Sequence, residues 1–191
     1  MKKLKIKEAL SKSIKLKQHL SFFRKFTRSR IHGYVLDFND NFVLIHQTDD
    51  FELDGFAILP IKTIKKVRYS EFEEMYEYIM QKEKLLNNLG INFSIDLTNW
   101  QTIFNSIEHS EKFAIIECEQ AWINRFLLGK LTKAKKKKIG ILFLEANGIF
   151  EEYVTEQKYK EITIVRFDEI YISLFQKYGR HKNQVLPKLK Q

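Results

Sequence analysis

Apolar and polar positions alternate with a period of two over much of residues 31–69, a pattern typical of short β-strands. The turn signal Asn39-Asp40-Asn41 interrupts the alternation, and Asn and Asp tolerate the backbone conformations of a tight hairpin turn. Pro60 marks a second boundary, because proline cannot donate a hydrogen bond to a neighbouring strand. The strands predicted in this way are 31–38, 42–46, 56–59 and 61–69. Short strands joined by tight turns predict a small, strongly bent barrel.

The hydrophobic period changes to about 3.6 at other places, which predicts helices. Residues 71–90 have one apolar face, and they end at Gly90, a residue type that commonly caps a helix. A second helix is predicted after Thr98, and its apolar face includes Trp100, which we interpret as a core residue. Residues 1–20 contain no Gly or Pro and predict an amphipathic helix with a narrow apolar stripe.

One phrase of the sequence occurs twice. The segment Ile61-Lys62-Thr63-Ile64-Lys65-Lys66-Val67-Arg68-Tyr69 corresponds to residues 159–167, with Arg68 aligned to Arg166. Internal similarity of this kind indicates a duplicated structural unit. The second unit is predicted to have strands over 113–119, 125–131, 139–144, 149–154 and 161–167.

The predicted fold is therefore mainly β with helices, an α+β chain built from two tandem small barrels with N-terminal and connecting helices. The predicted organisation is a basic amphipathic arm (1–30), a first barrel with the following helix (31–90), a helix with the second barrel (91–178) and a polar tail (179–191). With 191 residues, of which 44% are hydrophobic, the chain has enough apolar mass for two small cores.

Several classes of protein are disfavoured by composition. The single cysteine, Cys118, cannot form an internal disulfide, and we interpret it as inert core. No run of eighteen apolar residues and no apolar segment of a signal peptide is found, so we expect no membrane span and a cytoplasmic location.

Charge is distributed unevenly between the start of the chain and the rest. Residues 1–30 contain eleven Lys or Arg and one acid, a formal charge of +10, whereas residues 31–191 contain twenty-two bases and twenty-three acids, a formal charge of −1. A basic arm on a neutral body is typical of proteins that meet nucleic acid, an anionic membrane surface or an acidic partner. The alternative is a solvated helix that caps the first barrel through Leu10, Leu20 and Phe23.

Two basic segments are candidates for contact with nucleic acid. In the arm, cations alternate with aromatic rings, a combination that suits phosphate contacts beside stacked bases. A predicted hairpin tip contains a run of lysines, which repel one another. An anionic partner would relieve this repulsion, and so would water and salt. The candidate phosphate-binding residues are Arg24, Lys25, Arg28, Arg30, Lys133, Lys135, Lys136, Lys137 and Lys138, and the candidate stacking residues are Phe22, Phe23 and Phe26.

Residues 33–44 and 64–68 resemble the two sequence motifs of Sm-like proteins. The first has Gly33, an alternating strand and Asn41 before an apolar strand, and the second ends at Arg68. The resemblance covers about residues 22–70, and more weakly 98–170 through the repeat. It implies SH3-like barrels behind an N-terminal helix, strand pairing between subunits in many members, and RNA bound at positions that Asn41 and Arg68 match.

No residue pattern indicates catalysis. The sequence has no nucleophile elbow, glycine-rich phosphate loop or helical metal-binding pair, so we expect no enzyme activity, no cofactor and no metal. His46 and the acids of residues 49–54 are interpreted as a solvated acidic loop in preference to a metal site. Arg68 and Arg166 are interpreted first as partners of nearby acids, Glu71 and Glu169, and second as contacts to phosphate or base.

The leading functional hypothesis is a non-enzymatic protein that binds nucleic acid, RNA in preference to DNA, through the basic arm and the lysine-rich hairpin. The alternative is a protein-interaction or assembly module, in which barrel edge strands pair with other chains and the protein associates with itself.

Overall fold

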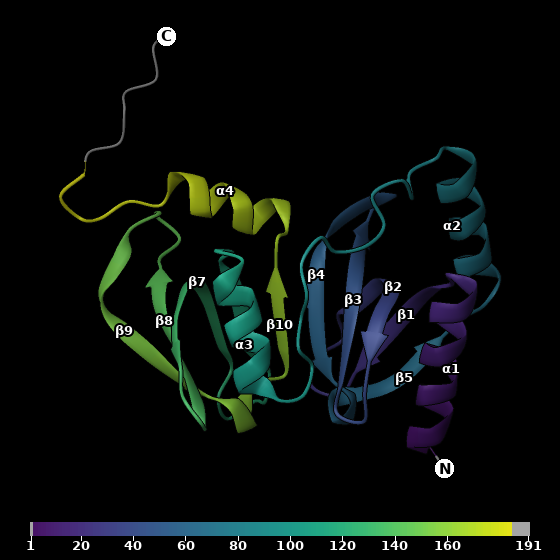
Figure 1. The fold of residues 1–191 in the computed structure, drawn as a ribbon, viewed down its shortest axis with the longest axis horizontal. Helices are drawn as coiled ribbons and strands as arrows, with labels where there is room; N and C mark the ends of the chain where they lie inside the picture. Colours follow the sequence, from purple (N-terminus) through teal and green to yellow (C-terminus); the bar gives the residue numbers. More distant parts are fainter. Residues whose placement is uncertain (1, 185–191) are drawn as a thin grey trace, which may run out of the picture.

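The computed structural model describes residues 2–184, with side chains from Lys5 onward, so Met1 and the last part of the predicted tail (185–191) lie outside the described residues. Within these residues the fold has ten strands and four helices (Figure 1). The strands are β1 (His19–Arg24), β2 (Arg30–Phe38), β3 (Phe42–Asp49), β4 (Glu52–Pro60), β5 (Ile64–Arg68), β6 (Ala114–Cys118), β7 (Arg125–Ala134), β8 (Lys138–Leu144), β9 (Phe150–Lys158) and β10 (Ile164–Phe167). The helices are α1 (Lys2–Leu16), α2 (Glu71–Lys82), α3 (Trp100–His109) and α4 (Ile170–Tyr178), with single 3₁₀ turns η1 (Ile61–Thr63) and η2 (Tyr159–Glu161).

All ten strands belong to one antiparallel sheet, in the order β5-β1-β2-β3-β4-β10-β6-β7-β8-β9. The prediction of a mainly β fold with helices is confirmed, but the prediction of two closed barrels is wrong. The edge of β4 pairs with β10, with Phe56 opposite Phe167 and Ile58 opposite Val165, and not with β5 of its own half. Because β4 and β5 do not pair, the first half does not close, and the sheet stays open with β5 and β9 at its edges.

The sequence repeat corresponds to a repeat of strand order. Each half places its fifth strand beside its first, as β5-β1-β2-β3-β4 and as β10-β6-β7-β8-β9. Each half also has a 3₁₀ turn before its fifth strand, η1 in the first and η2 in the second. The two copies of the repeated phrase thus form the same local structure.

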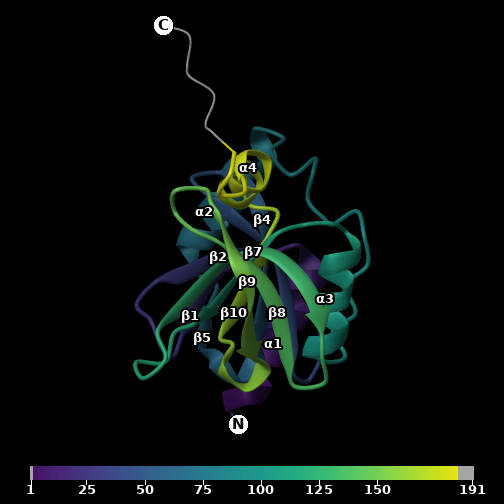
Figure 2. The ribbon, with the colours of Figure 1, turned by 90° about the vertical axis from the view of Figure 1, so that its left-hand side faces the viewer.

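The helices cover different parts of the sheet. Figure 2 shows α3 on the right of the sheet, α2 towards the left and α4 across the top. The largest apolar cluster contains residues of α3 and of both halves, including Ile58 of β4 and Val165 of β10. Because the rings of Phe56 and Phe167 lie 5.3 Å apart across the β4–β10 pair, the two halves share one core and are not separate barrels.

The interpretation of residues 1–30 as one arm needs correction. In α1, Ile6 and Leu10 are buried in an apolar cluster with β1, whose Leu20 and Phe22 are also buried. Strand β1 occupies an interior position of the sheet, between β5 and β2. The segment is therefore part of the fold, as the alternative interpretation through Leu10 and Leu20 proposed. None of the helices within residues 2–184 combines the length and the apolar content that a membrane crossing requires.

A histidine attaches the connector after α2 to the sheet. The N–H of Gly90 donates to Nδ1 of His46 at 3.2 Å, so the hydrogen bond needs a neutral ring. Burial lowers the pKa of His46 to about 4, although Asp168 and Asp54 oppose the shift, and burial also lowers the pKa of His19 to about 4. Both rings are therefore neutral at physiological pH.

We expect each of these histidines to lower the free energy of unfolding by up to about 1.4 kcal/mol per pH unit as the pH falls from about 6.5 towards about 4, while the raised pKa values of Glu77, Glu119 and Glu169 act in the opposite direction. As the pH falls, the histidines of the unfolded chain take up protons before those of the folded chain. The stability that comes from the two buried neutral rings is therefore fully present above the pKa of histidine in the unfolded chain and is lost as the pH falls below it. Denaturant unfolding at several pH values measures the change. The variant His46→Gln keeps an acceptor for Gly90 without titrating, so it should show a smaller pH dependence; an unchanged dependence would contradict the assignment.

Candidate nucleic-acid interface

A groove of about 580 Å³ lies where the two halves meet. We call it the basic groove and define it by Asn41, Lys62, Trp100, Lys136, Tyr159 and Lys160. Five elements supply these residues: the β2–β3 hairpin, η1, the first turn of α3, the β7–β8 hairpin and η2. Residues far apart in sequence thus surround one space, which is large enough for a small ligand or a short stretch of polymer.

Three exposed lysines give the groove its charge. Lys62 and Lys160 hold the same position in the two copies of the repeat, one in η1 and the other in η2, and Lys136 lies in the β7–β8 hairpin. The acid among the lining residues, Asp40, forms an ion pair with Lys7. The lining therefore has a formal charge of +2, which favours an anionic ligand.

Aromatic rings continue from the groove into the core. The Trp100 ring lies 4.8 Å from Phe42 and 5.5 Å from Phe104, and Phe104 stacks on Tyr159 at 5.7 Å. Trp100 is only half-buried, so the interpretation of this residue as core is incomplete: its ring also lines the groove. Contacts with Phe42 and Phe104 hold the Trp100 ring in place, so a planar group can stack on it without reordering the site.

Tyr159 adds a hydrogen-bonding group to this surface. Its hydroxyl is buried, and it has no hydrogen-bond partner among the described residues. Burial raises the pKa of Tyr159 to about 12, so the hydroxyl keeps its proton and can donate to a ligand. An unsatisfied buried hydroxyl is costly, and a ligand with an acceptor oxygen would remove that cost.

The β2–β3 turn holds Asn41 at the groove. The side-chain oxygen of Asn39 accepts the N–H groups of Asn41 and Phe42 at 2.7 and 2.9 Å, and its amide donates to the carbonyl of Leu97 at 2.6 Å. The carbonyl of Asn41 accepts the N–H of Ile61 at 2.7 Å. The backbone of Asn41 is thus fixed, while its side-chain amide is exposed beside Lys62.

Two of the residues predicted to contact nucleic acid are buried elsewhere. Nη1 of Arg24 lies 2.7 Å from the carboxylate of Glu119 across the junction, and only 8% of Arg24 is exposed. Phe22 is fully buried in the core under α1. Neither side chain can meet a polymer on the surface, so both assignments are wrong.

The other arm candidates lie on or near the β1–β2 loop. Lys25, Phe26, Arg28 and Arg30 are exposed, and Nζ of Lys25 donates to the carbonyl of Lys62 at 2.5 Å. Lys25 therefore lies next to the η1 side of the basic groove. Phe23 is half-buried, with the guanidinium groups of Arg30 and Arg68 at 4.6 and 5.8 Å from its ring and Nζ of Lys66 at 5.7 Å. Its ring is already covered by cations.

The two arginines of the repeat, Arg68 and Arg166, both pair with acids. This is the first of the two interpretations given for them from the sequence. Arg68 donates to Glu73 from Nε and Nη2, at 3.0 and 2.7 Å, and not to Glu71 as predicted. Arg166 pairs with Glu169, as predicted, and also donates to Glu117 at 2.7 Å. Arg68 does not line the basic groove, so of the two residues that match Sm-like RNA-binding positions only Asn41 lies there.

The lysines of the β7–β8 hairpin have different surroundings. Lys135 and Lys138 both pair with Glu156, the first at 2.7 Å, while Lys133 and Lys137 are exposed. Lys136 lines the groove. The hairpin therefore contributes one lysine to the groove, while two others form ion pairs with Glu156 of the neighbouring strand.

Four groove residues were missed as candidates: Lys62, Lys160, Trp100 and Tyr159. The repeat contained a signal for two of them, because Lys62 and Lys160 are aligned within the repeated phrase. Nothing local in the sequence shows that Trp100 and Tyr159 approach each other through Phe104.

The chain was compared with protein-family models, with curated proteins and with solved structures, and none of them matches it. The functional argument therefore depends on the geometry of the groove.

Proposed function

We propose that the protein is a non-enzymatic binder of single-stranded nucleic acid, RNA in preference to DNA, and that the basic groove is its binding site. The observation that carries the proposal is the placement of three exposed lysines, on three separate elements, around a partly exposed Trp ring. Cations along a groove with an aromatic platform are what single-stranded nucleic acid needs.

Each group has a role in this proposal. Lys62, Lys136 and Lys160 neutralise phosphates, and Trp100 stacks on a base. The Asn41 amide and the Tyr159 hydroxyl bond to a base edge or to a ribose 2′-hydroxyl, the group that distinguishes RNA from DNA. The preference for RNA is supported by the resemblance of the segment around Asn41 to the first Sm-like motif.

Fluorescence anisotropy of a labelled single-stranded RNA, measured at several salt concentrations, tests the proposal. Each phosphate neutralised on a single strand contributes about −0.7 to the slope of log K against log salt, so three lysines predict a slope of about −2. Absence of binding at low salt, or binding that does not depend on salt, would contradict the proposal.

A second candidate function is assembly, favoured by the pattern of strand pairing. The junction pairs the fourth strand of one half with the fifth strand of the other, and the same two kinds of strand, β9 and β5, remain at the free edges. Exposed edge strands readily pair with other chains. Light scattering over a range of concentrations distinguishes this candidate: a defined, salt-insensitive oligomer would favour assembly, and a monomer at all concentrations would count against it.

A further inference from the structure

A second cavity, of about 400 Å³, lies between the halves and has a very different lining. We call it the junction cleft and define it by Arg24, Asp49, Glu117, Glu119, Arg166 and Glu169. It shares no lining residue with the basic groove. An inference about its ligand is therefore independent of the proposed RNA binding.

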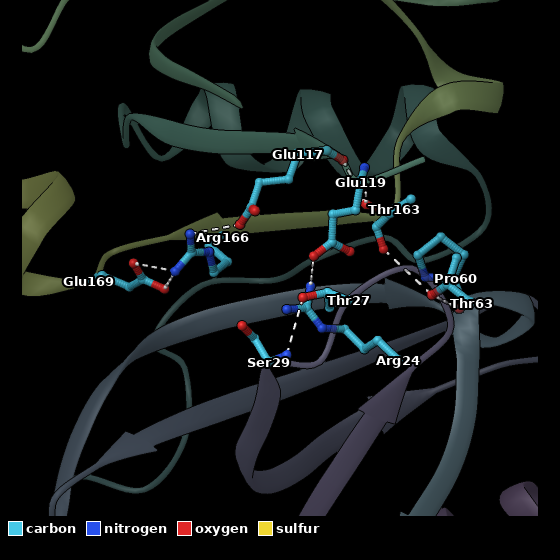
Figure 3. A network of polar contacts seen from close by, with 10 residues as sticks. All are labelled: Arg24, Thr27, Ser29, Pro60, Thr63, Glu117, Glu119, Thr163, Arg166 and Glu169. Carbon is cyan, nitrogen blue, oxygen red and sulfur yellow. Dashed lines mark hydrogen bonds and ion pairs between the residues drawn. The ribbon is translucent and has the colours of Figure 1, made fainter. Parts of the chain in front are cut away.

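The polar groups of the cleft are organised around two arginines (Figure 3). Arg166 lies between Glu117 and Glu169, and Glu169 also accepts a hydrogen bond from Gln47 of the first half at 2.6 Å. Arg24 reaches from β1 to Glu119, which follows β6. Side chains of both halves thus meet in one polar network.

Several buried atoms of this network have no hydrogen-bond partner among the described residues. On the donor side these are Nε and Nη1 of Arg24 and Nε of Arg166, and on the acceptor side Oε2 of Glu119. Nη1 of Arg24 still forms an ion pair with Glu119 at 2.7 Å, so Nε is the atom of this guanidinium that has no partner of either kind in the described part of the chain. Because unsatisfied buried polar atoms are rare and costly, their concentration in one cleft points to a ligand that has both acceptors and donors.

The charge of the cleft narrows the choice of ligand. Three arginines and five carboxylates line it, a formal charge of −2. Asp49, which is exposed at the cleft, forms no ion pair with the side chains of residues 5–184. A ligand with more positive than negative charge would therefore be favoured.

The lining also excludes other classes of ligand. It contains no Phe, Tyr or Trp, its aliphatic residues are Ile31 and Ile164, and its one imidazole is that of His32, so a large aromatic or apolar ligand would find little surface to pack on. Among the described residues, no group of three His, Cys, Asp or Glu side chains could hold a metal ion. A small hydrophilic molecule remains, with one carboxylate for the arginine N–H groups and two cationic groups for the carboxylates.

We propose that the junction cleft binds a basic α-amino acid, such as lysine or arginine. The ligand carboxylate pairs with Arg24, the α-ammonium group donates to Glu119, and the side-chain cation pairs with Asp49. A ligand charge of +1 reduces the charge of the cleft, and the ligand supplies partners for the unsatisfied atoms of the Arg24–Glu119 pair.

Isothermal titration calorimetry of the full chain tests this proposal with lysine and three analogues. Cadaverine lacks the carboxylate, 6-aminohexanoate lacks the α-amino group and norleucine lacks the side-chain amine. We expect lysine to bind and each analogue to have an affinity at least about tenfold lower. The reason is that a hydrogen bond to a charged group contributes at least that factor. Absence of lysine and arginine binding, or an analogue that binds as tightly as lysine, would overturn the proposal.

A matched pair of variants locates the ligand. Asp49→Asn removes a charge from the cleft, whereas Asp50→Asn removes the same charge from the adjacent residue, which does not line it. Both positions are exposed, so both variants should fold. Lysine affinity should fall about tenfold only for Asp49→Asn. Equal effects of the two variants would place the ligand elsewhere and overturn the proposal.

Discussion

The variant Glu73→Ala is expected to lose about 3–5 kcal/mol of unfolding free energy, the range for breaking a buried ion pair by removing one partner. Only 3% of Glu73 is exposed. Its carboxylate accepts hydrogen bonds from Arg68 at 2.7 Å, from Ser21, and from the hydroxyl and N–H of Ser70 at 2.7 and 2.9 Å. The substitution would leave Arg68 and both donors of Ser70 without this acceptor between α2 and the sheet, while the Ser21 hydroxyl would keep its contact with Nδ1 of His32.

The ionisation of Glu73 supports the expected loss. Burial alone would raise the pKa of this carboxyl, but hydrogen bonds from Arg68, Ser21 and Ser70 outweigh burial and lower the pKa to about 2. The contribution to stability is therefore present above the unfolded pKa of 4.5 and is lost as the pH falls towards about 2.

Denaturant unfolding followed by circular dichroism measures the effect. Glu74→Ala is the matched control, because Glu74 is exposed in the same turn of α2, and its substitution should change stability by less than about 0.5 kcal/mol. If the two variants lost the same free energy of unfolding, the loss would come from the charge at the start of α2. That result would contradict the role given to the buried network around Glu73.

The second large effect is expected on RNA affinity. Replacing Lys62, Lys136 and Lys160 together by alanine should weaken the binding of single-stranded RNA about 100-fold at low salt, which corresponds to about 2.7 kcal/mol. The salt slope should also fall towards zero, because the variant no longer releases the counterions of three phosphates. All three lysines are exposed, so the fold should be unaffected.

A matched triple variant distinguishes the groove from the basic N-terminal segment. Lys5, Lys12 and Lys15 are exposed on α1 and do not line the groove. Their replacement by alanine changes the net charge by the same amount, but it should reduce affinity less than about threefold, since distant exposed charges are screened. A loss as large as that of the groove variant would move the binding site to α1.

The strands were largely predictable from sequence, apart from β1, which lies in the predicted basic arm, but the way they close was not. Alternation placed the β2–β3 hairpin and its Asn39–Asn41 turn correctly, since these depend on local residues. Whether β4 pairs with β5 or with β10 depends on a competition between two similar strands, because β5 and β10 both belong to the repeated phrase. A duplicated pattern cannot show which copy occupies the edge.

The site was predicted only in part, for a related reason. Two of the predicted nucleic-acid contacts line the basic groove: Asn41, which came from the Sm-like resemblance, and Lys136, which came from the lysine run. Arg24 was mistaken for a surface cation because its partner, Glu119, lies in the other half of the chain. Local sequence shows which residues carry charge, but the burial of that charge is set by contacts between the two halves.

Tryptophan fluorescence provides the most direct test that RNA binds in the basic groove. The protein has two tryptophans, and Trp122 is 80% exposed, so Trp122→Phe leaves Trp100 as the only reporter at little cost to stability. Titration of this variant with single-stranded RNA should quench the Trp100 emission, with the same affinity and salt slope as anisotropy gives. RNA binding by anisotropy without a change in Trp100 emission, or no binding at low salt, would contradict the account.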